Sequence, residues 1–215
     1  MTTTILFDLD GTLVDTAPDL GHALNLQLAK HDKPALSSAK IRPFASHGSI
    51  GLLGLGFGIT PDDASFITMR DEYLDIYESV LTRTPTLFNG MQITLDGLAA
   101  RGLAWGIVTN KPSRFTVPLV ASMGLNQKAV CVVSGDDASK PKPSPETLLL
   151  ACEKAQIQPE NCFYVGDAER DIEAGRAAGM KTVVALYGYI EEKDKPLAWG
   201  ADAVINQPQN LLKLI

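Results

Sequence analysis

The feature that most constrains this chain is the segment 7–13, with the sequence Phe-Asp-Leu-Asp-Gly-Thr-Leu. It continues the apolar run 5–7 and is bounded by Gly11, so we expect a short buried β-strand that ends in the carboxylates of Asp8 and Asp10. Burying unpaired carboxylates costs free energy, and a chain that places two of them at one strand end must neutralise them with a cation, a proton or a bound partner. The segment therefore indicates a metal site.

From residue 88 onward, short apolar strands alternate with helices. This alternation predicts a doubly wound, Rossmann-like α/β fold, in which helices cover both faces of a parallel sheet. Ligands of such sheets bind beyond the carboxyl ends of the strands. We expect strands at 104–108, 130–133, 162–165, 182–185 and 203–205, and helices near 90–101, 113–123, 145–156 and 169–178.

Residues 15–85 interrupt this alternation, because their apolar residues recur at helical spacing with hardly any strand signal. We expect an all-helical insert at 15–85, within an α/β core domain formed by residues 1–14 and 86–215. The run Thr-Pro-Asp-Asp at 60–63 predicts a helix start with proline at the first helical position. The glycine-rich segment 51–58 lacks both a preceding strand and a following Lys-Ser or Lys-Thr, so a nucleotide-binding loop is not indicated.

Three further polar motifs follow along the chain: Thr109-Asn110 after one apolar strand, Lys142 between two prolines, and Gly166-Asp167-x-x-x-Asp171 after another strand. Together with Asp-x-Asp at 8–10, and in this order, they resemble the motifs of the haloacid dehalogenase-like (HAD) hydrolases. The helical insert directly after the first motif resembles the cap of the phosphoglycolate phosphatase-like branch. The resemblance covers nearly the whole chain.

The resemblance implies roles for the core residues. Asp8 would be the nucleophile that forms an aspartyl phosphate, and Asp10 would protonate the leaving group and then activate water. Thr109 and Asn110 would donate hydrogen bonds to the phosphoryl oxygens, and Lys142 would balance negative charge. Lys140 lies close to Lys142 in the sequence; the Lys-Pro-x-Pro spacing favours Lys142, and a surface position for either lysine stays open.

The resemblance also implies a magnesium ion, held by Asp8, the backbone carbonyl of Asp10 and Asp167. Asp171, four residues after Asp167, would orient Lys142 or a metal-bound water, although a solvated position on a helix is the alternative. Four aspartates and a phosphate dianion bring six negative charges together, whereas one magnesium ion and Lys142 supply three positive ones. A proton on Asp10 and nearby hydrogen-bond donors close part of this gap.

The acid at position 10 favours phosphatases and phosphomutases over the dehalogenases of the family, whose leaving group needs no proton. We expect a small, carboxylated phosphometabolite such as 2-phosphoglycolate as substrate, with N-acetylmuramic acid 6-phosphate as the alternative. A phosphosugar mutase and a non-catalytic sensor of a phosphorylated ligand are further alternatives. Arg42 and His47 belong to the expected specificity loop 42–48, unless they only cap or cover helices of the insert.

Composition narrows the class of protein. The 215 residues are 45% hydrophobic, which suffices for a full core. The net charge of −6 and the absence of a basic run argue against nucleic-acid binding. No apolar stretch is long enough for a membrane span, so we expect a cytoplasmic protein without a membrane partner. For the oligomeric state we expect a monomer or homodimer. Three cysteines without a CxxC pair indicate buried, reduced thiols.

Overall fold

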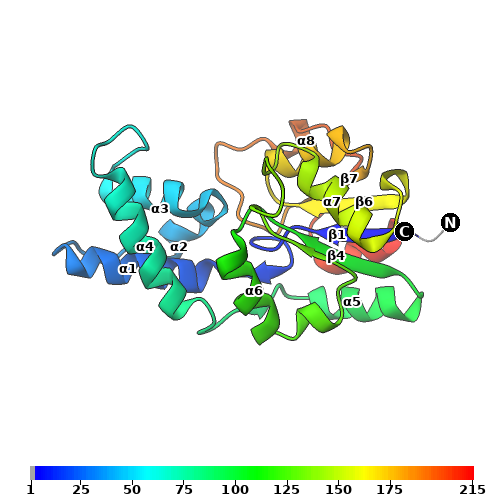
Figure 1. Cartoon of the computed structure of the whole chain (residues 1–215), viewed down its shortest axis with the longest axis horizontal. Helices are drawn as coiled ribbons and strands as arrows, with labels where there is room; N and C mark the ends of the chain where they lie inside the picture. The colour runs from blue at the N-terminus through cyan, green and yellow to red at the C-terminus, as the bar shows by residue number, and fades with distance from the viewer. Residues whose placement is uncertain (1–2) are drawn as a thin grey trace.

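A sheet of six parallel strands forms the centre of the molecule in the computed structural model, which describes residues 3–215. The strand order is β5-β4-β1-β6-β7-β8 (Figure 1). The strands are β1 (Thr4–Phe7), β4 (Ala104–Val108), β5 (Val132–Val133), β6 (Cys162–Gly166), β7 (Lys181–Ala185) and β8 (Ala203–Ile205). This architecture confirms the predicted doubly wound α/β fold.

Strand β1 is buried along its whole length and pairs with β4 on one side and β6 on the other. Its side chains alternate between the two faces of the sheet: Ile5 and Phe7 belong to one hydrophobic cluster, and Leu6 belongs to another. Because both faces are covered, residues 5–7 of the strand form a continuous apolar run, as expected for a central strand of a parallel sheet. The segment 7–13 therefore leaves the sheet at its middle.

Four helices cover the sheet, α5 (Met91–Ala100), α6 (Ser113–Ser122), α7 (Glu146–Ala155) and α8 (Glu169–Ala177). Helices α7 and α8 lie on one face, and α5 lies on the other, as Figure 1 shows. Apolar residues of α5 and α6 pack in the cluster that contains Phe7, whereas those of α7 pack in the cluster that contains Leu6. Short 3₁₀ helices occur at η2 (Leu125–Gln127), η3 (Pro159–Asn161), η4 (Pro196–Ala198) and η5 (Pro208–Lys213).

Residues 17–80 form helices that lie together at one end of the molecule, on the left in Figure 1. They are α1 (Ala17–Lys30), α2 (Ser38–Ile41), η1 (Arg42–His47), α3 (Gly48–Phe57) and α4 (Phe66–Val80). A two-stranded antiparallel ribbon, β2 (Val14–Asp15) with β3 (Thr86–Leu87), lies where the chain leaves and re-enters the sheet region. The division into a core domain (1–14 and 86–215) and a cap domain (15–85) stays a prediction that this layout supports.

One local prediction was wrong, and another was confirmed only in part. Residues 60–63, where we expected a helix start, form a turn in which the Asp63 carboxylate accepts a hydrogen bond from the Thr60 backbone N–H at 2.6 Å, and α4 begins only at Phe66. The strand expected at 130–133 is confirmed in part: β5 covers Val132–Val133, and the Val130 N–H and the Cys131 carbonyl also hydrogen-bond with the backbone of β4, both at 2.9 Å. None of the helices in residues 3–215 combines the length and apolarity that a bilayer span needs.

Candidate active site

Asp8 occupies the first position after β1 and is buried. Its backbone N–H donates to the carbonyl of Val165 on β6 at 2.9 Å, so the sheet ladder itself fixes the start of the loop. The loop then turns at Gly11, whose φ of +86° favours glycine. A Cβ atom at Gly11 would lie 2.1 Å from Oδ2 of Asp167. Only glycine therefore lets this loop pass so close to Asp167, the carboxylate that follows β6.

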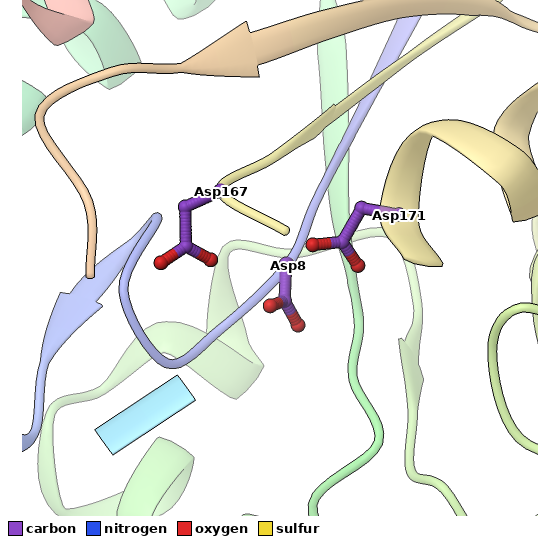
Figure 2. A group of neighbouring side chains, drawn as sticks. All are labelled: Asp8, Asp167 and Asp171. Carbon is purple, nitrogen blue, oxygen red and sulfur yellow. The ribbon is translucent and has the colours of Figure 1, made fainter. Parts of the chain in front are cut away.

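Asp167 and Asp171 reach the same place from β6 and the first turn of α8 (Figure 2). Carboxylate oxygens of Asp8, Asp167 and Asp171 lie within 4.8 Å of one another, and all three side chains are buried. The backbone N–H of Tyr189 donates to Oδ2 of Asp167 at 2.7 Å, and Ala168 N–H donates to Oδ2 of Asp171 at 3.0 Å. The backbone thus holds two of the three carboxylates in fixed positions.

Lys142 is buried between two of these carboxylates. Its Nζ lies 2.9 Å from Oδ1 of Asp8 and 2.7 Å from Oδ1 of Asp171, and it donates to the Tyr164 hydroxyl at 2.6 Å. Lys140, by contrast, is exposed. The structure places Lys142 where the sequence motif predicted it, and the contact with Asp171 supports the predicted orienting role of that carboxylate.

Thr109 follows β4 at the same edge of the sheet, and its backbone N–H donates to Val133 on β5 at 2.9 Å. The Asn110 amide makes two hydrogen bonds with the backbone of Lys142, one to its carbonyl and one from its N–H, both at 2.8 Å. Asn110 therefore positions the loop that contains Lys142, and it also lines the cavity described below. Its predicted contact with substrate stays a prediction.

The acidic cluster carries more negative charge than Lys142 balances. Burial raises the pKa of Asp8 to about 6, against the lowering effect of Lys142. Burial, followed by repulsion from Asp8 and Asp171, raises the pKa of Asp167 to about 8. Lys142 therefore offsets only part of the effect of burial and of repulsion among the three carboxylates. Hard carboxylate oxygens of this number and spacing suit Mg²⁺, and Asp8 and Asp167 are the side chains that would hold it.

The Asp10 carboxylate is bound by two other groups. The Thr16 hydroxyl donates to its Oδ1 at 2.5 Å, and Lys111 Nζ lies 3.0 Å from the same oxygen. Lys111 directly follows Thr109-Asn110 in the sequence, and the sequence analysis missed it. Its position next to that motif is the only signal that could have indicated it.

A cavity of about 620 Å³ lies between the sheet edge and the helices of residues 17–80. Asp8, Asp10, Thr109 and Asn110 line it from the core. Its other wall is largely apolar and aromatic, and two arginines that the sequence analysis did not select, Arg70 and Arg170, also line it. A larger cavity of about 940 Å³, beside α5 and α6, contains none of the predicted site residues. The cavity with the carboxylates is therefore the candidate active site.

The two cap residues predicted to bind substrate have protein partners. Arg42 pairs with both carboxylate oxygens of Asp15 at 2.9 and 2.8 Å, and it does not line the 620 Å³ cavity. His47 lines that cavity, and its Nε2 lies 2.5 Å from Oε1 of Glu191. A substrate contact by either residue stays a prediction; for Arg42 it would require release from Asp15.

This fold and site define a class of protein: an α/β enzyme with an acidic cluster suited to a divalent cation, beside a cavity lined by helices on its other side. Comparison of the sequence with family models agrees, because the model described as haloacid dehalogenase-like hydrolase matches residues 5–185. The chain belongs to the haloacid dehalogenase-like hydrolase family.

Individual relatives cover almost the whole chain. It is 37% identical to the N-acetylmuramic acid 6-phosphate phosphatase of Pseudomonas aeruginosa, over 98% of this chain and 93% of the relative. It is 40% identical to the phosphoglycolate phosphatase of Xanthomonas campestris pv. campestris, over 96% of this chain and 93% of the relative. The crystal structure of a predicted phosphoglycolate phosphatase from Haemophilus somnus superposes with a TM-score of 0.82 at 26% identity, covering 99% and 97% of the two chains.

Proposed function

We propose that this protein is a Mg²⁺-dependent phosphomonoester phosphatase that acts through an aspartyl phosphate on Asp8. The observation that carries the proposal is the contact of Lys142 with both Asp8 and Asp171, beside Asp167 and at the base of the cavity. The contact with Lys142 favours the charged, nucleophilic form of Asp8 against the effect of burial, and the cavity gives a substrate access to it.

The two half-reactions assign one role to each residue. An oxygen of Asp8 attacks phosphorus, the ester bond breaks, and Asp10 gives its proton to the departing alkoxide oxygen. Asp10 then takes a proton from the water that attacks the aspartyl phosphate, which releases inorganic phosphate and restores Asp8. When bound, Mg²⁺ would neutralise charge on the phosphoryl group. Lys142 and Thr109 would balance the charge that develops on the phosphoryl oxygens.

The substrate that we propose is a carboxylated phosphomonoester, either 2-phosphoglycolate or N-acetylmuramic acid 6-phosphate. The cavity favours the larger ester, because about 620 Å³ lies within the range of pockets that enclose drug-sized ligands and far exceeds a two-carbon molecule. Its apolar wall, with Phe66, Leu74 and Phe115, also suits a ring and an acyl group. Relatives with both activities match this chain.

We further propose that residues 15–85 act as a cap that excludes water from the site. We also propose that the enzyme is cytoplasmic and acts as a monomer or homodimer on a small metabolite. A phosphosugar mutase would use the same core residues and would differ in its product. A non-catalytic sensor would need no intact acid at position 10.

The test is phosphate release from the two esters by the purified protein, with Mg²⁺ and with a chelator. We expect turnover of both only with Mg²⁺, and a higher kcat/KM for N-acetylmuramic acid 6-phosphate. A higher kcat/KM for 2-phosphoglycolate would reverse the order of the two substrates. Absence of phosphate release from any ester would contradict the phosphatase proposal. Transfer of the phosphoryl group to a second hydroxyl of the sugar would identify a mutase.

A further inference from the structure

Arg170 differs from the other cationic side chains that surround the active-site cavity. Lys142 contacts Asp8 and Asp171, Lys111 contacts Asp10, and Arg70 contacts its neighbour Asp71. Within residues 3–215, by contrast, no carboxylate oxygen lies within 4.0 Å of a guanidinium nitrogen of Arg170. A partly buried guanidinium without a carboxylate partner beside a substrate cavity has donors available for an anion.

The position of Arg170 joins the two sides of the cavity. The residue is the second of α8, directly before Asp171, so its backbone lies next to the acidic cluster. Its Nη2 donates to the carbonyl oxygen of Ser46 at 2.8 Å and lies 3.0 Å from the Ser46 hydroxyl oxygen, in η1 on the opposite side. A guanidinium has five N–H donors, and Ser46 is the only protein partner of this one among the described residues. Ser46 orients the guanidinium group of Arg170, and the N–H donors that do not contact Ser46 remain free.

The charge of the site supports a direct role for Arg170. Asp8, Asp10, Asp167 and Asp171 with a phosphate dianion would carry six negative charges. Lys142 and one Mg²⁺ offset only half of these. The structure adds two positive charges, Lys111 beside Asp10 and Arg170 at the cavity wall. The remaining negative charge disappears when Asp10 carries the proton that the leaving group requires. Arg170 thus completes the compensation that lets a dianionic substrate enter.

We propose that Arg170 binds an anionic group of the substrate through its free N–H donors, with Ser46 holding the guanidinium in place. This proposal rests on the phosphatase function proposed above. The recognised chemistry is a pair of anionic oxygens, which a planar guanidinium binds through two parallel hydrogen bonds. Those oxygens belong either to the carboxylate of the leaving group or to the phosphoryl group itself.

The experiment compares Arg170→Gln and Arg170→Lys with Arg176→Gln, a matched change at an exposed position of the same helix. Kinetics with Mg²⁺ are measured for N-acetylmuramic acid 6-phosphate and for p-nitrophenyl phosphate, which lacks a carboxylate. A KM increase of roughly tenfold or more for the first ester alone assigns Arg170 to the carboxylate. A similar increase for both esters, with weaker inhibition by inorganic phosphate, assigns it to the phosphoryl group. We expect Arg170→Lys to recover part of the loss and Arg176→Gln to behave as wild type.

Binding measurements separate this proposal from the phosphatase function. Calorimetric titration of the Mg²⁺-loaded protein with inorganic phosphate and with N-acetylmuramic acid needs no turnover. Loss of affinity for one of them in Arg170→Gln, but not in Arg176→Gln, supports the proposal even if the wild type hydrolyses no ester. Unchanged KM values, unchanged inhibition by phosphate and unchanged binding of both ligands in folded Arg170 variants would overturn it. If Arg170→Gln does not fold, the same comparison is made with Arg170→Lys, which keeps the charge but loses the paired geometry.

Discussion

The ammonium group of Lys111 lies 3.0 Å from Oδ1 and 3.3 Å from Oδ2 of Asp10. It also lies 4.7 Å from the centre of the Tyr77 ring, which belongs to α4. Burial lowers the pKa of Lys111, but attraction to Asp10 outweighs it, so the pKa of this lysine is raised and the group stays charged. One core lysine therefore connects the proposed general acid with a helix of the proposed cap.

Lys111→Met is expected to lower kcat by about tenfold to a hundredfold, because Asp10 loses the cation that orients it while Thr16 still holds one oxygen. Lys111→Arg should recover part of this loss, because it restores the charge. The measurement is kcat and KM for p-nitrophenyl phosphate, with Lys140→Met, at an exposed position, as the control. A Lys111→Met enzyme with wild-type kcat would show that Lys111 only fills the space beside Tyr77.

Asp8→Asn is expected to reduce turnover by at least about a thousandfold, because an amide cannot act as the nucleophile. The fold should persist, since asparagine has nearly the same shape and Lys142 keeps its contact with Asp171. Phosphate release and far-UV circular dichroism measure the two effects. Residual phosphate release close to the wild-type rate would exclude covalent catalysis by Asp8.

Mg²⁺ should stabilise the protein more at pH 8 than at pH 5. The pKa of Asp8 is raised to about 6 and that of Asp167 to about 8, both above the ordinary value of 3.8. Ionising either group therefore favours the unfolded state, and the metal-free protein loses stability as pH rises from about 4 to 8. A cation that binds the ionised carboxylates reverses this loss, whereas protons compete with it at lower pH.

The measurement is the Tm with Mg²⁺ and with a chelator at the two pH values. Asp8→Asn provides the control, because it removes one of the two titrating groups and should shrink the pH dependence of the Mg²⁺ effect. An equal rise of Tm at both pH values would show that Mg²⁺ does not bind at these carboxylates.

Gly11→Ala should lower both stability and Mg²⁺ affinity. The new Cβ would meet the Asp167 carboxylate at 2.1 Å, in addition to the backbone strain of a φ near +86°. Gly124→Ala is the matched control, because Gly124 also has a positive φ, +64°, and nothing lies within 4 Å of its added Cβ. The control is expected to cost about 1–2 kcal/mol in free energy of unfolding. Gly11→Ala is expected to cost more.

Denaturant unfolding gives the stability of both variants, and titration of Mg²⁺ gives the affinity. Retention of wild-type Mg²⁺ affinity by Gly11→Ala would mean that Asp167 can move without loss of the site, so that the close packing of the two strand ends has no functional role.

The sequence was sufficient for the fold and for the core motifs. Strands such as β4, β6 and β8 are short apolar runs next to turn residues, and these patterns are local, so they can be recognised without a three-dimensional structure. Because carboxyl ends of parallel strands meet at one edge, the convergence of Asp8, Thr109 and Asp167 also follows from the strand pattern. The failure was local too: a turn at residues 60–63 takes the place of the expected helix start, and α4 begins at Phe66.

The sequence by itself determined which residue types lie at the ends of the strands, because apolar periodicity and turn residues are encoded within a few positions of one another. Only the tertiary structure decided which side chains compensate those acids: Lys111 for Asp10, and Arg170 held by Ser46, at separations of 101 and 124 residues. The physical reason is that such contacts depend on the distance between two groups in space: the pairing of β1 with β4 brings Asp10 and Lys111 together, and the position of η1 beside α8 brings Ser46 to Arg170.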